Sequence, residues 1–131
     1  MISILQNLEP RIEEAGQILY EELDEIEEII FITEGSVDVG YDLNRNRKFV
    51  LRFDKRHVIG IFNCTFDVRA MFVYMSKTKC TGYFLRKRTW KRLLNEYTNI
   101  SNVLRYKVHE DYTVNIKTKV LALKNRDLNK V

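Results

Sequence analysis

Short runs of apolar residues, separated by polar turns, occupy the first two thirds of the chain. Runs rich in Ile, Val, Phe and Tyr are typical of strands, because these side chains pack well on a pleated surface. Such runs lie at residues 17–20, 28–33, 36–41, 49–53, 72–75 and 81–85. Gly35 separates the second run from the third as a tight hairpin does, and Val37, Val39 and Tyr41 share one face of the third. The pattern predicts a sandwich or roll of short strands.

The spacing of apolar residues becomes helical after Lys87. From there apolar residues recur mostly three or four positions apart, which places them on one side of a helix. They are Trp90, Leu93, Leu94, Tyr97, Ile100, Val103, Leu104, Val108, Tyr112, Ile116, Val120 and Leu123. We expect two consecutive helices over residues 87–124, broken near Thr98–Asn99 and followed by a tail at residues 125–131.

The second of these helices has a basic face as well as an apolar one. The basic residues are Arg105, Lys107, Lys117, Lys119 and Lys124. We therefore expect this helix to pack on the roll along one side only, which leaves its other side available to a partner. A further short helix is expected at residues 1–9, because the residue before Pro10 favours extended backbone and ends it.

Length and composition favour one domain. With 131 residues and 45% hydrophobic residues, the chain can bury a core without disulfides or a structural metal. No stretch approaches the roughly 18 consecutive apolar residues of a membrane-spanning helix, and the N-terminus lacks the basic start of a signal peptide. Cys64 and Cys80 are too few for a disulfide framework, so we expect reduced, packed thiols in a cytosolic protein.

Charge is distributed unevenly along the chain. Residues 1–42 carry twelve acidic side chains and one basic one, a net charge of −11, whereas residues 43–131 carry twenty-one basic and six acidic ones, a net charge of +15. A basic half can indicate a nucleic-acid or anionic-membrane surface. We expect instead that the acidic segment faces the basic one, within the domain or in a neighbouring subunit, and that no nucleic acid binds.

No motif indicates an enzyme. His57 and His109 lie far apart, and neither belongs to a nucleophile or metal motif. A cluster of carboxylates could hold a hard cation, but it lacks EF-hand spacing and a turn glycine. It consists of Glu21, Glu22, Asp24, Glu25, Glu27 and Glu28. A solvated acidic loop between strands is the expected structure, with no metal site and no catalytic residue.

Several segments occur in an order that is found in one known family. Leu8-Glu9-Pro10-Arg11 precedes Gly16-Gln17-Ile18-Leu19, and the stretch Ile29–Val37 has an apolar-aromatic pattern around Gly35. Further on come Thr78-Lys79-Cys80, Leu85 and then Trp90 to Tyr97. Over residues 5–115 this order resembles the cyclic-nucleotide-binding family, above all its domains in tetrameric cation channels.

The resemblance implies a fold that is mainly β with helices (α+β): an antiparallel β-roll of the jelly-roll or double-stranded β-helix kind, followed by two C-terminal α-helices. One domain would then cover residues 1–131. Its parts would be an N-terminal helix at 1–9, the β-roll at 10–86 with a phosphate cassette at 59–70, the helices at 87–124 and the tail at 125–131.

In this family the cassette binds the cyclic nucleotide. A glycine turn leads into a short helix whose N–H groups face the phosphate, an Arg adds a charge-assisted bond, and a Glu binds the ribose 2′-hydroxyl. The resemblance places the ligand-binding positions of this chain at Gly60, Ile61, Phe62, Asn63, Cys64, Arg69 and Ala70.

The cassette of this chain departs from the family pattern. Gly60 matches the glycine, but Ile61 stands where the Glu belongs. An ungapped alignment puts Ala70 at the Arg position and Val73 at the Thr or Ser position, and Arg69 is brought into place only by a one-residue shift. Nearby apolar residues (Phe62, Phe66, Met71 and Phe72) also fill the segment. A degenerate, non-binding pocket is the main hypothesis, and a working site that uses Arg69 and local N–H groups is the alternative.

The resemblance leads to a functional expectation. The chain would be a cytosolic regulatory domain, excised from a tetrameric potassium or cation channel, that modulates gating through subunit contacts without a cofactor. Its partners would be other subunits or domains of the channel, with a homo-oligomer left open, and its link to the membrane would be through the parent protein alone. Ether-a-go-go-type channels have such domains, in which a segment after the last helix enters the empty pocket; here only residues 125–131, with Leu128, are available. The alternative is a cAMP or cGMP receptor domain of a channel or of a kinase regulatory subunit.

Overall fold

The computed structural model describes residues 4–129. The elements are, in order, α1 (Ile4–Asn7), β1 (Glu9–Glu13), β2 (Ile18–Tyr20), β3 (Glu28–Glu34), β4 (Val37–Leu43), β5 (Asn46–Phe53), β6 (His57–Ile59), α2 (Ile61–Phe66), β7 (Val73–Ser76), β8 (Cys80–Arg86), α3 (Lys87–Glu96), α4 (Thr98–Tyr112), the π-helical turn η1 (Thr113–Lys117) and α5 (Thr118–Asn129).

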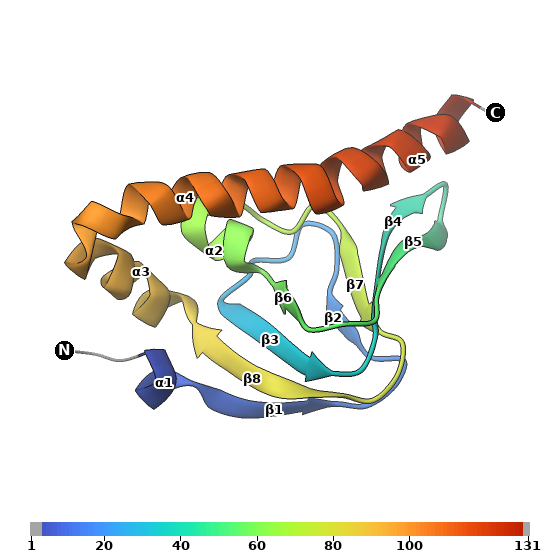
Figure 1. Ribbon diagram of the computed structural model, residues 1–131. Helices are drawn as coiled ribbons and strands as arrows, with labels where there is room; N and C mark the ends of the chain where they lie inside the picture. The colour runs from blue at the N-terminus through green and yellow to red at the C-terminus, as the bar shows by residue number, and fades with distance from the viewer. Residues whose placement is uncertain (1–3, 130–131) are drawn as a thin grey trace.

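The strands form two antiparallel sheets that enclose the core. One sheet has the strand order β1-β8-β3-β6 and the other the order β2-β7-β4-β5. Val37, Val39 and Tyr41 are all buried, as their shared face predicts, and they join Ile29 and Leu85 in one hydrophobic core. This arrangement confirms the predicted β-roll followed by C-terminal helices (Figure 1).

Two strands were not among the expected runs. β1 is polar and contains Pro10, which is tolerated because β1 lies at the edge of its sheet and pairs only with β8. β6 has only three residues and is also an edge strand, paired with β3. Neither segment carries a strand signal of its own, and both take their conformation from the neighbouring strand.

The C-terminal helices cover the open side of the roll. α3 ends at Glu96 and α4 begins at Thr98, where the break was expected. From there α4, η1 and α5 form one long helix that runs over α2 and on to β4 and β5 (Figure 1). The sequence pattern predicts Ile100 and Val103 on the side of the helix that packs on the roll, but both side chains are exposed.

The π-helical turn keeps the long helix in register with the roll. Its buried residues Val108, Tyr112, Ile116 and Val120 are spaced four apart. In an α-helix of 3.6 residues per turn, such a stripe drifts by about 40° at each step. The wider turn at Thr113–Lys117 takes up this drift, so all four side chains face the core.

The boundaries at both ends differ from those expected. α5 continues to Asn129, so residues 125–129 are helical and not a tail, whereas residues 130–131 lie outside the described part. The hydroxyl of Tyr41 donates to the carboxylate of Asp127, and Lys48 forms an ion pair with the same group at 2.8 Å. These contacts fix the end of α5 beside β4 and β5. Leu128, the hydrophobic residue available for entry into the pocket, is 46% exposed and does not lie in it. At the other end, the helix stops at Asn7, and residues 1–3 are not described.

Ion pairs link the acidic segment to the basic one within the domain. Arg47 contacts Glu21 and Asp42, and Arg52 contacts Asp38. Arg86 pairs with Glu9 in the same way. The uneven charge along the sequence is thus partly neutralised by folding. Among residues 4–129, no helix has the length and apolar character needed to cross a bilayer.

Candidate functional site

The cassette segment begins with a glycine turn and a short helix. Gly60 follows β6 with φ of 88°, in the left-handed region, and α2 starts at the next residue. Inside the segment, the side-chain amide of Asn63 donates to the backbone carbonyl of Arg69 at 3.1 Å. This bond closes the loop from α2 back towards β7.

The C-terminal end of α2 is bound to α3 and α4. The indole N–H of Trp90 donates to the hydroxyl of Thr65 at 2.9 Å, and Lys91 donates to the backbone carbonyl of Thr65 at 2.8 Å. Lys91 and Lys87 both pair with Asp67, at 2.8 and 2.9 Å, and their hydrogen bonds lower the pKa of that carboxyl group. Cations at a helix C-terminus are favourable. These bonds join the cassette helix to the C-terminal helices.

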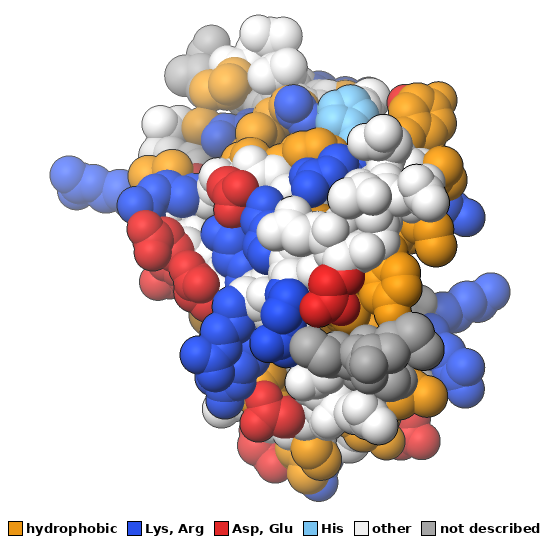
Figure 2. Space-filling model, turned by 90° about the vertical axis from the view of Figure 1, so that its left-hand side faces the viewer, with side chains coloured by type: hydrophobic (Ala, Val, Ile, Leu, Met, Phe, Trp, Pro, Cys, Tyr) orange, Lys and Arg blue, Asp and Glu red, His pale blue; other side chains and the backbone are white. Residues whose placement is uncertain are grey.

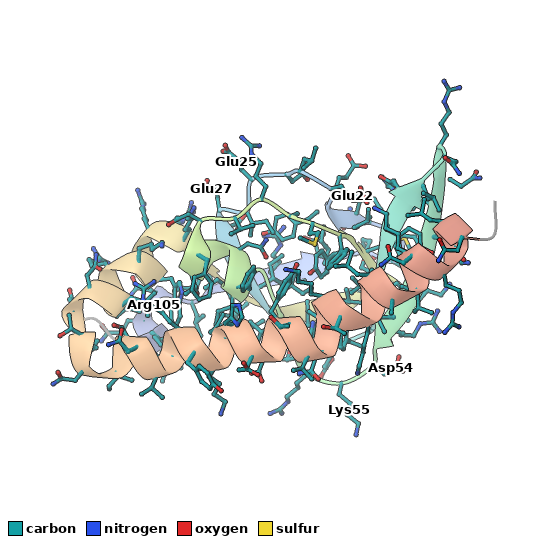
Figure 3. The ribbon with its side chains drawn as sticks, turned by 90° about the horizontal axis from the view of Figure 1, so that it is seen from above. Glu22, Glu25, Glu27, Asp54, Lys55 and Arg105 are labelled. Atoms are coloured by element: carbon teal, nitrogen blue, oxygen red, sulfur yellow. The ribbon has the colours of Figure 1, made fainter. Side chains whose placement is uncertain are left out.

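The arginine of the cassette points away from the interior. The side chain of Arg69 is 60% exposed, forms an ion pair with Glu25 at 2.9 Å and donates to the carbonyl of Leu23 at 3.0 Å. Figure 3 shows Glu25 projecting at the outside of the molecule. Ala70 is buried next to it, and its N–H donates to the carbonyl of Asp24 at 2.9 Å.

The long helix closes the other side of the cassette. The ring of Tyr112 stacks on that of Phe62 with a centroid distance of 4.0 Å and an angle of 3°, and it also approaches Phe72 at 6.4 Å. Tyr112 is only 7% exposed. Burial raises the pKa of its hydroxyl group to about 12, so it is neutral in the folded domain at ordinary pH. Tyr112 thus packs directly on the cassette helix.

Four of the residues that were placed in the site line one cavity. Gly60, Ile61, Phe62 and Asn63 border a space of about 620 Å³ between β3 and β6 on one side and α4 and η1 on the other. The structure separates the remaining three from it. Cys64 is buried beside Ile26, and Arg69 and Ala70 belong to the opposite end of the cassette loop.

His57 lies in the wall of this cavity and was not expected there. Its ring stacks on Phe53 at 3.8 Å, and its buried Nε2 atom has no hydrogen-bond partner among the described residues. Burial lowers the pKa of this imidazole to about 4. A single histidine without a motif gives no signal in the sequence, because only the pairing of β6 with β3 brings it to the cavity.

The low pKa of His57 makes stability depend on pH. Between pH 4 and 6.5 the unfolded chain binds a proton at His57 that the folded chain does not, so the free energy of unfolding falls as the pH falls. From pH 7 to pH 5 we expect a loss of about 2 kcal/mol from this group. Urea unfolding of the wild type and of His57→Phe at both pH values measures it.

The matched control for this prediction is His109→Gln. His109 is the other histidine of the chain and is exposed. From pH 7 to pH 5, the free energy of unfolding of His109→Gln should fall as much as that of the wild type, whereas that of His57→Phe should not. If His57→Phe shows the same change between pH 7 and pH 5 as the wild type, His57 is not the group responsible.

A second hollow lies on the face formed by α1 and α3. Its lining includes Arg86, Arg88 and Arg92 together with Gln6 and Asn7. Figure 2 shows this side of the molecule, with Lys and Arg side chains across its middle and hydrophobic side chains near its edges. This face therefore exposes both cationic and hydrophobic side chains, and protein–protein interfaces use both.

Solved structures with the same architecture are cyclic-nucleotide-binding and related domains. The match to the C-linker and CNBHD of zELK channels, crystallised in the presence of cAMP, covers 82% of this chain and 54% of the zELK chain, at 15% identity and a TM-score of 0.70. The regulatory subunit of a cAMP-independent protein kinase A from Trypanosoma brucei matches 86% of this chain and 42% of its own at 23% identity and a TM-score of 0.64. The regulatory domain of Toxoplasma gondii PKA with cAMP matches 68% and 34% at 15% identity and a TM-score of 0.64.

These matches define the class of fold. The chain has the cyclic-nucleotide-binding domain fold, as the order of its sequence motifs predicted. It spans from about a third to about half of the length of these three structures. No protein-family model and no curated protein sequence matches the chain.

Proposed function

We propose that this domain is a cytosolic regulatory module of a tetrameric cation channel that does not bind cyclic nucleotides and acts through contacts with other parts of the channel. The outward position of Arg69 carries the proposal. Its guanidinium group is engaged by Glu25 and by the carbonyl of Leu23, so it offers no charge to a phosphate at the cassette helix. The domain has no catalytic role of its own in this proposal.

The remaining groups of the cassette favour the same conclusion. Ile61 has no carboxylate for a ribose hydroxyl, and Val73 at the start of β7 is buried and apolar. A hydrated phosphate and ribose would lose their hydrogen bonds to water here without replacement, which is costly. The stack of Tyr112 on Phe62 further narrows the approach to α2.

The surface is the part of the domain available for regulation. Ile100, Val103 and Tyr106 are exposed on α4, and Arg88 and Arg92 are exposed on α3. The bonds of Trp90, Lys91 and Arg105 to Thr65 connect both helices to the cassette helix. Contacts with neighbouring subunits on this face would therefore act on the roll directly.

The channel context rests on the likeness to the zELK domain. A kinase regulatory subunit is the second context, favoured by the likeness to the Trypanosoma brucei subunit, whose kinase is cAMP-independent. The parent sequence distinguishes them. Six hydrophobic spans before this domain would support the channel, and a second copy of the domain would support the kinase regulator.

Calorimetry with cAMP and cGMP tests the loss of binding. We expect no heat of binding to the domain at ligand concentrations up to about 1 mM, which sets a free energy weaker than about −4 kcal/mol. Arg69→Ala is the test variant. Arg45→Ala, which removes another exposed arginine, is its control. Micromolar binding that is lost in Arg69→Ala and kept in Arg45→Ala would overturn the proposal in favour of a working receptor.

A further inference from the structure

The cavity beside the cassette has the dimensions and lining of a small-molecule site. Its volume of about 620 Å³ falls within the range of ligand pockets. Its walls are mainly apolar: Phe31, Ile32, Val58 and Ile59 on the side of the sheet, and Leu104, Val108, Tyr112 and Ile116 on the side of the long helix. These walls favour an apolar body over a hydrated one.

Charged groups without partners line the same cavity. Arg56 comes from the turn between β5 and β6, where Figure 3 shows its neighbours Asp54 and Lys55 projecting outward. Lys107 comes from α4, on the other wall, and Asp111 follows it by one turn. Within residues 4–129, none of Arg56, Lys107 and Asp111 makes an ion pair or a side-chain hydrogen bond, although Lys107 and Asp111 have a spacing that allows one.

Some cations of this domain have a carboxylate partner, whereas others, Arg56 and Lys107 among them, have none within residues 4–129. Arg11, Arg47, Arg52 and Lys91 each pair with a carboxylate. Two free cations and one free carboxylate leave a positive balance at the cavity, which favours an anion. Charge-assisted hydrogen bonds from an Arg and a Lys suit a carboxylate group.

His57 is a further polar residue in the wall of the cavity. Its buried Nε2 atom has no partner among the described residues, whereas buried polar atoms in folded proteins are nearly always hydrogen-bonded. This atom is closed to solvent, so a ligand in the cavity would reach it only if the imidazole ring turned.

We propose that the cavity binds a small amphipathic anion, with an acyl or aromatic body between the two apolar walls and one carboxylate between Arg56 and Lys107. The inference rests on the proposed function, because it gives the domain a ligand of another class in place of a cyclic nucleotide. Binding would draw the long helix and β6 together, since the two cations lie on opposite walls. The ligand would in this way set the position of α4, which carries the exposed contact surface.

Titration of the domain with dodecanoate, a monocarboxylate with an apolar chain, tests the inference. Calorimetry gives the affinity, and amide NMR shifts locate the site. We expect binding in the micromolar range, with shifts at residues 56–61 and 104–116, and binding at least about tenfold weaker for methyl dodecanoate, which has no charge. The double variant Arg56→Gln/Lys107→Gln should lose about tenfold in affinity.

Lys119→Gln is the matched control for the double variant. Lys119 lies on the same long helix, is exposed and does not line the cavity, so its variant should bind dodecanoate as the wild type does. No binding to the wild type at about 1 mM, or equal binding by the wild type and the double variant, would overturn the inference.

A parallel titration with cAMP separates this inference from the proposed function. If dodecanoate binds and cAMP does not, both are supported. If both ligands bind, with cAMP binding dependent on Arg69, the proposed function fails; the carboxylate site then stands, but not as a replacement for a cyclic-nucleotide site. If neither binds, the inference fails and the proposed function stands.

Discussion

Tyr112→Ala is expected to lower the free energy of unfolding by about 3–5 kcal/mol, the usual cost of removing a buried aromatic ring. The ring contacts Phe62 and Phe72 and joins the long helix to the core, so its loss leaves a hole between α2 and η1. Stacked rings also contribute about 1 kcal/mol beyond their burial. Urea unfolding followed by circular dichroism measures the change.

Tyr106→Ala is the control for this variant. Tyr106 lies on the same helix but is 69% exposed, so its removal should change the free energy of unfolding by less than about 0.5 kcal/mol. Equal losses in the two variants would mean that the helix does not pack on the roll through Tyr112. The Tyr112→Ala variant should still fail to bind cAMP, because Ile61 and Arg69 are unchanged.

Gly60→Ala is expected to cost about 3 kcal/mol of unfolding free energy, for two separate reasons. A residue with a side chain at the left-handed φ of 88° is strained by about 1–2 kcal/mol. The added Cβ would also lie 2.9 Å from the carbonyl oxygen of Glu28 and from Cγ2 of Ile26. The backbone of β3 would have to move to admit it, and α2 would move with it. Thermal or urea unfolding measures the combined cost.

Gly16→Ala separates the two reasons. Gly16 has a similar φ of 85°, but no atom lies within 4 Å of the position of its Cβ. This variant carries the strain alone, about 1–2 kcal/mol. A loss in Gly60→Ala no larger than that in Gly16→Ala would contradict the close approach of β3 to the start of the cassette.

Most of the roll could be predicted from local patterns. The alternation in β4 identifies Val37, Val39 and Tyr41 as inward-facing, because successive side chains of a strand point to opposite faces. Edge strands β1 and β6 could not be predicted, since one contains Pro10 and the other has three residues. Their conformation depends on hydrogen bonds to strands that lie distant in the sequence.

The sequence locates the cassette but does not determine the direction of its arginine side chain. Gly60 and Ile61 are where the motif predicted, and both line the cavity. The direction of Arg69 was open, because a one-residue shift of the alignment would have brought it to the phosphate position. Its partner Glu25 lies 44 residues earlier, and no pattern in the chain relates the two.

The amino-acid sequence is sufficient for most strands and helices and for the turn at Gly60, since these follow from local spacing and residue type, and its resemblance to the family identifies the missing carboxylate at Ile61. Tertiary structure alone decides the rest of the site. It turns Arg69 towards Glu25, stacks Tyr112 on Phe62 and brings Arg56, His57 and Lys107 to one cavity. The physical reason is that these groups meet through sheet pairing and helix packing, which join residues tens of positions apart and leave no trace in local periodicity.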